Sequence, residues 1–353
     1  MAKKVLIVDD SALVRKQLSE IISTLDFEID IAKNGQEAVS KALNTQYDVI
    51  TMDINMPIMD GIEAVRQIMI KKPTAILMIS SLTTADADVT MDALDLGAID
   101  YIPKPGTMNV GKNENRQEIL QKVKSLSFIP KRRLKSRRTN RVQREKPEKQ
   151  KSQKPQAREG NEKIEKIILI GSSTGGPGLI EQICASLPLN YKYPVCIVQH
   201  MPEQFTQSFA SRLDRASKLN VYETSKNMEV LPGNIYIAKG GTHLNFTKKI
   251  SGKVIIRQND EKGDAYFQPS VNEMMLSAAK VFNPSDVVAV LLTGIGDDGA
   301  IGMVELKKAG AYTLGESEES ATVYGMPKVA FDMGGVSEQL DFMKILKKVT
   351  TLK

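Results

Sequence analysis

Short apolar runs alternate with helical patterns along the first part of this chain. Four runs have the composition of buried strands, at residues 5–8, 49–52, 75–79 and 99–103. Between them, apolar positions recur at the spacing of an amphipathic helix, at residues 13–22, 35–43, 61–70 and 84–96. Regular alternation of strand and helix predicts a parallel sheet that is covered by helices on both faces.

A second set of buried-strand patterns follows in the C-terminal half, at residues 167–170, 194–199 and 287–292. Each of these runs ends in glycines, hydroxyls or charged residues, and the first leads into a helical pattern near Pro177. We therefore predict a second α/β domain, doubly wound and mostly parallel, over residues 163–353.

Polar residues stand at the carboxyl ends of the N-terminal strands. Asp9 and Asp10 follow the first run, Asp53 the second, Ser80 the third and Lys104 the last. Strand ends of a parallel sheet converge on one edge, so these groups are expected to meet there. Hard oxygen ligands of this kind suit Mg²⁺, and the lysine and hydroxyl complete a site for a phosphoryl group on Asp53. Scattered surface and capping acids are the weaker interpretation, because five such residues stand at the ends of the four strand runs.

The glycine-rich loop after residue 170 has a serine at its centre. Gly171-x-Ser173-x-Gly175 matches the tight strand-to-helix turn that exposes a nucleophilic hydroxyl. Amides at the start of the next helix, near Thr174 and Gly175, are candidates to hold a developing oxyanion. A dinucleotide-binding loop is disfavoured, since Ser173 replaces the middle glycine and no acid stands about twenty residues later.

A serine nucleophile needs a base, and the chain has two histidines. His200 follows the strand pattern at 194–199, so it is expected at the same sheet edge as Ser173. His243, in a glycine loop, is the rival. The third run leads to Asp297 and Asp298, either of which could orient the imidazole. The chain order Ser, His, Asp argues against an α/β-hydrolase.

The positive charge of the chain is confined to one segment. From residue 131 to 154 there are 12 Lys and Arg against two Glu, a net charge of +10, whereas the whole chain carries +6. The remainder is therefore at −4. This segment is almost free of apolar residues after Leu134, so we predict a self-repelling, flexible linker over residues 126–162. Non-specific contact with nucleic acid is the alternative, and no DNA-reading motif accompanies it.

Length and composition agree with a two-domain cytoplasmic protein. The chain has 353 residues, and no apolar run approaches the 18 of a membrane span. Its N-terminus leads directly into the first strand pattern, which is untypical of a signal peptide. Cys184 and Cys196 lie in apolar surroundings without metal-ligand spacing, so we expect buried free thiols.

Residues 1 to about 125 resemble a response-regulator receiver domain. The matching residues are Asp9-Asp10, Asp53-x-x-Met56-Pro57-x-x-Asp60-Gly61, Ser80 and Lys104-Pro105. The resemblance implies a five-stranded flavodoxin-like fold and Mg²⁺-dependent phosphorylation of Asp53 by a chemotaxis histidine kinase. It also places Ser80 and Tyr101 at the family's switch positions.

Residues from about 163 onward resemble the catalytic domain of the chemotaxis protein-glutamate methylesterases, the CheB family. The matching segments are Gly171–Gly176, Gln199–Pro202, Leu292–Gly299, Tyr324–Pro327 and Met333–Val336. The resemblance implies Ser173 as nucleophile, His200 as base and Asp298, rather than Asp297, as orienting carboxylate. Ile295 and Asp297 depart from the methionine and asparagine common in that family.

The two resemblances together imply a phosphorylation-controlled serine esterase. It would demethylate glutamate methyl esters, and deamidate glutamines, on methyl-accepting chemotaxis receptors, without a metal in the esterase domain. Two other hypotheses are a receiver-controlled docking protein that has lost hydrolysis, and a DNA-binding regulator.

Overall fold

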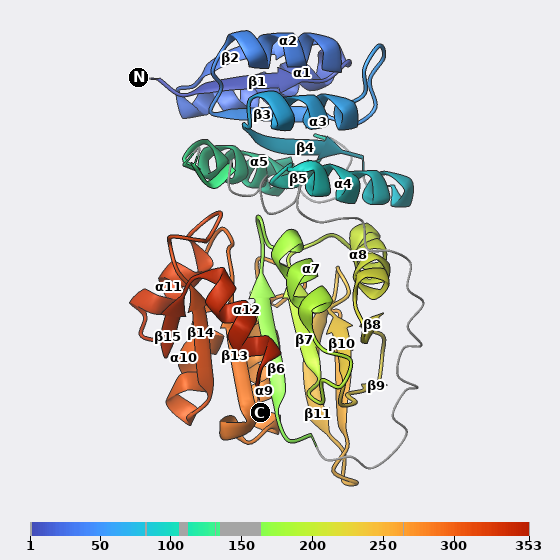
Figure 1. The fold of residues 1–353 in the computed structure, drawn as a ribbon, viewed down its shortest axis with the longest axis vertical. Coiled ribbons are helices and arrows are strands. Elements are labelled where there is room, and N and C mark those ends of the chain that lie inside the picture. Colours follow the sequence, from blue (N-terminus) through green and yellow to red (C-terminus); the bar gives the residue numbers. More distant parts are fainter. Residues whose placement is uncertain are drawn as a thin grey trace. The chain divides into compact units, whose positions relative to one another are not determined.

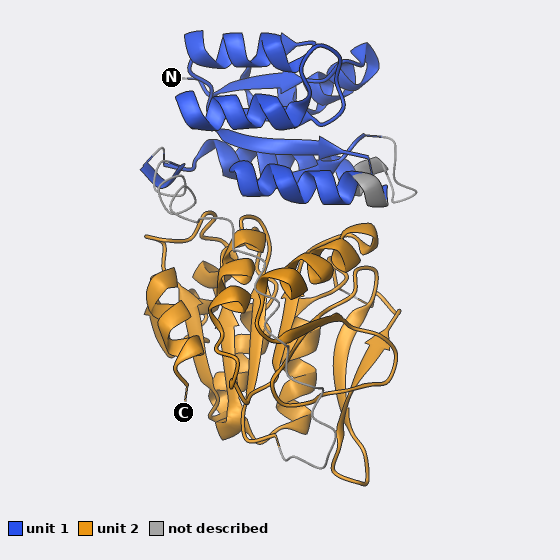
Figure 2. Ribbon diagram, turned by 45° about the vertical axis from the view of Figure 1, so that its right-hand side comes forward, with its two compact units in different colours: residues 1–146 blue, residues 147–353 orange. Residues whose placement is uncertain are grey.

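The computed structural model describes residues 2–81, 83–105, 112–130, 132–134, 164–263 and 265–352. They form two compact units, residues 1–146 and 147–353 (Figure 2). Most of the predicted linker, residues 126–162, lies outside the described ranges, and its boundaries remain a prediction. Within the first unit, however, order continues past residue 125, because Leu126 and Leu134 are both buried in its core.

The first unit is a five-stranded parallel sheet with the strand order β2-β1-β3-β4-β5 (Figure 1). Its strands are β1 (Lys4–Val8), β2 (Glu28–Ala32), β3 (Val49–Asp53), β4 (Ala75–Ser80) and β5 (Asp100–Pro103). Its helices are α1 (Ala12–Ile22), α2 (Gly35–Asn44), α3 (Gly61–Lys71), α4 (Thr84–Leu96) and α5 (Lys112–Ser127). The predicted alternation and sheet type are confirmed.

Local signals in the sequence explain where these helices begin. Asn34, Asp60 and Thr83 each accept a hydrogen bond from the backbone N–H three residues later, as N-cap residues do. Apolar residues of α1 and α5 then pack against β1, β3 and β4 in a single core cluster. The strand ends that carry the polar residues are thus held by a packed sheet.

The second unit contains a seven-stranded parallel sheet with the strand order β15-β14-β13-β6-β7-β10-β8. Its strands are β6 (Ile167–Ser172), β7 (Val195–Gln199), β8 (Asn220–Glu223), β10 (Asn234–Ile237), β13 (Val287–Leu291), β14 (Tyr312–Glu316) and β15 (Glu338–Leu340). The chain builds the sheet outward from β6 on one side, through β7, and later returns to add β13 on the other side. Open α/β sheets bind their ligands at such a switch point. The doubly wound, mostly parallel fold is confirmed.

Helices cover both faces of this sheet, and a small antiparallel sheet is added to it. The helices are α7 (Pro177–Ser186), α8 (Glu203–Ala216), α9 (Val271–Val281), α10 (Ala300–Ala309), α11 (Met326–Asp332) and α12 (Phe342–Thr350). The small sheet consists of β9 (Met228–Glu229), β11 (His243–Lys248) and β12 (Val254–Asn259), which the strand patterns did not predict.

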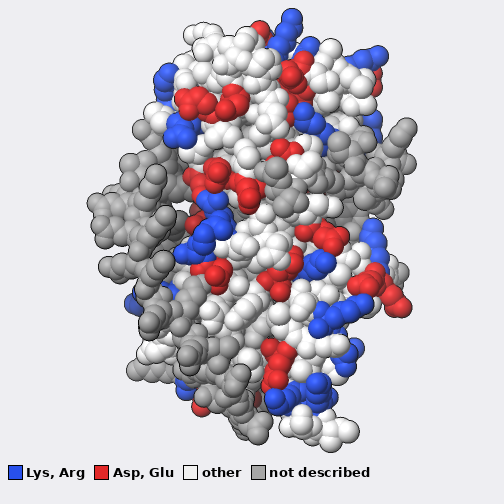
Figure 3. Space-filling view, turned by 90° about the vertical axis from the view of Figure 1, so that its right-hand side faces the viewer, with Lys and Arg blue, Asp and Glu red and all other residues white. Residues whose placement is uncertain are grey.

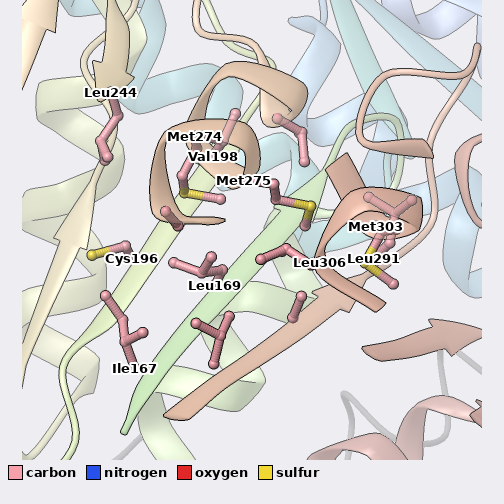
Figure 4. Packing of buried hydrophobic residues seen from close by; sticks show 14 of the residues in the cluster. Ile167, Leu169, Cys196, Val198, Leu244, Met274, Met275, Leu291, Met303 and Leu306 are labelled. Atoms are coloured by element: carbon pink, nitrogen blue, oxygen red, sulfur yellow. The ribbon is translucent and has the colours of Figure 1, made fainter. Parts of the chain in front are cut away.

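One core cluster of the second unit lies between the large sheet and helices α9 and α10. Figure 4 shows Met274 and Met275 of α9 and Met303 of α10 in one buried cluster with Leu169 of β6. Each buried side chain of this size contributes on the order of 1.5–3 kcal/mol relative to exposure. This packing fixes the N-terminus of α9 next to the ends of β6 and β13.

Both cysteines are buried free thiols, as predicted, and burial raises the pKa of each. No helix among the described residues is both long enough and apolar enough to cross a membrane. On the face seen in Figure 3, lysines and arginines of the described residues are interspersed with aspartates and glutamates.

Candidate functional site

Ser172, the last residue of β6, and Ser173, which follows the strand, have different surroundings. Ser172 is fully buried, and its hydroxyl donates to Oε1 of Gln199 at 2.7 Å. The amide of Gln199 donates in turn to the carbonyls of Ser173 (3.0 Å) and His200 (3.1 Å). The Ser172 hydroxyl therefore stabilises the loop, and the Ser173 hydroxyl is not part of this hydrogen-bond network.

The backbone around Ser173 forms the predicted tight turn. Its N–H donates to the Thr293 carbonyl at 3.0 Å, and its carbonyl accepts from Gly176 N–H at 2.8 Å. Gly175 has a φ of +80°, which favours glycine, and a Cβ there would lie 2.6 Å from Oγ1 of Thr322. Because the Ser173 amide is already bonded, an oxyanion would need other donors. The assignment of Thr174 and Gly175 to that role stays a prediction.

Strand register places His200 beside Ser173. Ser172 of β6 pairs with Gln199 of β7, and the His200 N–H donates to the Ser172 carbonyl at 3.1 Å. Ser173 and His200 are therefore the next residues on two adjacent strands. The structure thus brings together two residues that stand 27 positions apart in the sequence.

The His200 ring is oriented by Asp298. Nε2 lies 2.7 Å from Oδ2 of Asp298, whereas Nδ1 is buried without a hydrogen-bond partner in the part of the chain that the structure describes. A carboxylate only accepts hydrogen bonds, so in the neutral imidazole this contact selects the tautomer with the proton on Nε2 and the lone pair on Nδ1. This is the reverse of the familiar serine-protease arrangement, in which Nε2 is the base.

Asp298 is held by the N-terminus of α9 as well as by His200. Oδ1 accepts from the Ser270 hydroxyl (2.8 Å) and Asn272 N–H (2.9 Å), and Oδ2 accepts from Val271 N–H (2.6 Å) in addition to His200. Burial raises the pKa of Asp298, but the His200 contact and these amides outweigh burial, so the net pKa is lowered. Asp298 is therefore an ionised partner for the imidazole.

The other two candidates from the sequence lie elsewhere. Asp297 is exposed, and it is Asp298 that contacts His200. His243 is the first residue of β11, is buried, and accepts the Ser270 N–H at 3.2 Å through Nδ1. The rival histidine thus contacts the segment that supports Asp298 rather than the loop that carries Ser173.

Several supporting residues were missed by the sequence analysis. Ser270 has a recognisable signal, since Ser270-x-x-Glu273 before an apolar run is a capping-box pattern. Thr293 lies in the Leu292–Gly299 segment that resembles the family, but no local pattern predicts its contacts: its hydroxyl donates to the Thr174 carbonyl (2.9 Å), and its N–H donates to the buried carboxylate of Glu316 (2.8 Å). These contacts join β13 and β14 to the serine loop.

The polar residues of the first unit also converge, as predicted. Lys104 Nζ lies 2.9 Å from Oδ1 of Asp53 and 3.5 Å from Oδ2 of Asp9. One carboxylate oxygen each of Asp9, Asp10 and Asp53 lies within 4.8 Å of the others. Oδ2 of Asp53 is buried without a hydrogen-bond partner among the described residues, and buried Oδ2 of Asp9 has the ion pair with Lys104 but no hydrogen bond there. Buried anionic oxygens that are this poorly compensated fit a divalent cation such as Mg²⁺.

The net pKa of Asp53 is raised to about 6: burial is the largest cause and nearby Asp9 acts in the same direction, while the Lys104 contact lowers the pKa. The switch candidates lie on the next two strands, Ser80 at the end of β4 and Tyr101 on β5. The Ser80 hydroxyl donates to the Ser81 carbonyl and accepts from Thr90 of α4 at 3.1 Å. The Tyr101 ring is buried, with Lys122 Nζ 5.5 Å from its centroid.

Comparison with known proteins matches both halves of the chain to families. Residues 168–349 match the CheB methylesterase family, and residues 5–116 match the response regulator receiver domain. The catalytic domain of Thermotoga maritima CheB methylesterase superposes with a TM-score of 0.51 at 39% identity, over 53% of this chain and 98% of that one.

Similarity to two curated relatives extends over the full length. A protein-glutamate methylesterase/protein-glutamine glutaminase 2 of Carboxydothermus hydrogenoformans is 45% identical over 99% of this chain and 98% of its own. The corresponding protein of Caldanaerobacter subterraneus is 41% identical over 98% of this chain and 96% of its own. The chain therefore belongs to the CheB methylesterase family, as a hydrolase with an N-terminal response regulator receiver domain.

Proposed function

We propose that this chain demethylates glutamate methyl esters, and deamidates glutamines, on cytoplasmic helices of methyl-accepting chemotaxis receptors. The observation that carries the proposal is the hydrogen-bonded His200–Asp298 pair beside the serine turn at the switch point of the sheet. The names of the two relatives, protein-glutamate methylesterase/protein-glutamine glutaminase, agree with a chemistry of this kind. We place the reaction in the cytoplasm, where these receptor segments lie.

In the first step, Ser173 Oγ attacks the γ-carbonyl carbon of the substrate, and its proton passes to Nδ1 of His200. The ring then carries a positive charge, which the ionised Asp298 stabilises through the Nε2 hydrogen bond. The negative charge on the substrate oxygen is assigned to backbone N–H donors near Thr174 and Gly175.

In the second step, the tetrahedral intermediate collapses. The C–O bond to the methoxy group breaks, and His200 returns the proton from Nδ1, so that methanol leaves. A glutamine substrate loses ammonia in the same way. Water then attacks the acyl-enzyme with His200 again as base, which releases the glutamate carboxylate and restores Ser173.

The test is a methanol-release assay on receptor membranes that carry labelled methyl esters. We expect release that depends on the enzyme, and labelling of Ser173 by a fluorophosphonate probe. The family comparisons do not favour a non-catalytic docking protein, and that alternative predicts neither signal. Absence of methanol release from receptors that a known methylesterase demethylates would overturn the proposal.

We propose further that a chemotaxis histidine kinase phosphorylates Asp53. Asp9, Asp10 and Asp53 would hold Mg²⁺, which neutralises charge on a phosphoryl group when it is bound. Lys104 is already within hydrogen-bond distance of Asp53 and would pair with the phosphoryl oxygens. Ser80 and Tyr101 would respond to the added charge as switch residues.

Phosphorylation is expected to raise the esterase activity of the full-length chain. The control we propose is relief of a block, because a linker as polar as residues 131–154 is poorly suited to transmit torque. A small phosphodonor with Mg²⁺ should therefore stimulate methanol release, and residues 163–353 alone should exceed the unphosphorylated full-length rate.

The control for this experiment is Asp53→Ala, which should not respond to the phosphodonor. The isolated C-terminal domain could release methanol only at the basal rate while the phosphorylated full-length chain is strongly stimulated. That result would show that the receiver domain activates the esterase rather than blocks it. A full response in Asp53→Ala would remove Asp53 from the mechanism.

A further inference from the structure

The imidazole of His200 has an aromatic ring stacked on its face. The centroids of the His200 and Phe267 rings are 3.9 Å apart, and the two planes are inclined by 18°. Phe267 lies in the segment between β12 and α9, three residues before the N-cap residue Ser270. The His200 side chain is only 5% exposed. One stretch of chain therefore contacts both the face of the imidazole and, through Ser270, its carboxylate partner.

Phe267 is itself supported by a neighbouring ring. Tyr266 packs edge-to-face against it, with centroids 4.8 Å apart and planes inclined by 79°. Asp298 accepts hydrogen bonds from Ser270, Val271 and Asn272 just beyond this pair. The aromatic pair is thus anchored at its C-terminal side by the same helix end that anchors the carboxylate.

We propose that Phe267 is a positioning residue for the hydrolytic reaction, which holds the plane of the His200 ring so that Nδ1 faces Ser173. This inference rests on the proposed function. The Phe267 ring also lies where it stabilises the imidazolium that forms when Ser173 is deprotonated, through attraction between a cation and an aromatic face.

The hydrogen bond to Asp298 alone does not fix the base. Nε2 lies on the far side of the ring from the Cβ–Cγ bond, so its contact mainly sets the direction in which the ring points. Nδ1 is attached directly to Cγ, so its position depends on rotation about the Cβ–Cγ bond. The torsion angle about that bond is broadly distributed in histidine. A parallel ring at 3.9 Å restricts that rotation, because tilting the imidazole would bring its edge into Phe267.

The test uses the full-length protein and three substitutions. Phe267→Leu keeps an apolar cover but removes the ring, and is expected to lower kcat for methanol release by about tenfold, with KM changed less than about twofold. Phe267→Tyr keeps the ring and should stay within about threefold of the wild-type kcat. The matched control is Phe282→Leu, since Phe282 is also partly buried and paired with an aromatic ring, Phe246, at 5.3 Å; its kcat should be unchanged.

A spectroscopic signal tests the contact directly, and the presence of only two histidines in the chain makes it readable. In histidine-labelled protein, the Cε1–H resonance of His200 should be displaced by the ring current of Phe267. Phe267→Leu should abolish that displacement and leave His243 unaffected, whereas Phe282→Leu should change neither resonance. If Phe267→Leu folds poorly, Phe267→Met should show the same kcat loss, since it also covers the imidazole without a stacked aromatic ring.

The possible failures are distinguishable. A wild-type kcat for Phe267→Leu, in an enzyme that Ser173→Ala inactivates, overturns the role of Phe267 and leaves the proposed function intact. An equal loss in Phe267→Tyr and Phe267→Leu also overturns it, because the ring would then be irrelevant. An enzyme in which Ser173→Ala retains activity contradicts the role of Ser173 as nucleophile, and a wild-type enzyme that releases no methanol contradicts the proposed function; in both cases the resonance of His200 still reports on the stacking.

Discussion

Replacing Ser173 with alanine is expected to abolish ester hydrolysis, with a loss on the order of 10⁴-fold or more, because nucleophile, base and orienting acid act as a unit. The neighbouring Ser172→Ala should retain most of its activity per folded molecule. Ser172 donates to Gln199 rather than facing the substrate, so its loss removes a structural hydrogen bond. A buried acceptor left unpaired costs on the order of 1–3 kcal/mol, and we expect the variant to unfold at a lower temperature.

The measurement is methanol release by the two variants at equal concentrations of folded protein, with thermal unfolding measured in parallel. Ser173→Ala should unfold near the wild-type temperature, since its hydroxyl lies outside the Ser172–Gln199 network. We therefore expect Ser173→Ala to lose activity with little change in stability, and Ser172→Ala to lose stability with little change in activity. Equal losses of activity in both would contradict the choice of Ser173.

Strands that form continuous apolar runs were predictable from the sequence, and the remaining strands, including the buried β10 and β14, were not. β6 and β13 read as continuous apolar runs because helices cover them on both sides. β2, with the sequence Glu-Ile-Asp-Ile-Ala, and β8, with Asn-Val-Tyr-Glu, lie at sheet edges and are partly exposed. Their polar residues hide the strand signal, so only the receiver resemblance implied a fifth strand in the first unit.

The candidate site was predictable to the level of residues but not of atoms. Strand ends in a parallel sheet brought Ser173, His200 and a carboxylate together, yet spacing could not separate Asp297 from Asp298. That choice came from the family resemblance, and the hydrogen bond from His200 agrees with it. Asp298 determines which imidazole nitrogen faces the acid, and Phe267 is the ring that stacks on the imidazole. These two residues follow His200 in the chain by 98 and 67 positions. No local pattern encodes such contacts.

Asp298→Asn is expected to lower the turnover of methanol release by up to about 10⁴-fold, as in triads where control of the imidazole tautomer is lost. The carboxylate accepts four hydrogen bonds, from His200, Val271, Ser270 and Asn272. An amide nitrogen in place of Oδ2 would face two N–H donors, and His200 would have to present a lone pair at Nε2. Nδ1 would then carry the proton and could not accept one from Ser173.

The opposite orientation of the amide keeps an oxygen toward His200 but removes the negative charge that stabilises the imidazolium, so turnover falls in either case. Asp297→Asn is the matched control, because Asp297 is exposed and the substitution is chemically identical. It should change turnover only mildly. Both variants are to be compared by single-turnover methanol release, and the protonation of the two imidazole nitrogens of His200 is to be read from nitrogen chemical shifts in histidine-labelled protein. A larger loss in Asp297→Asn, or an unchanged rate in Asp298→Asn, would require the triad to be redrawn around a different carboxylate.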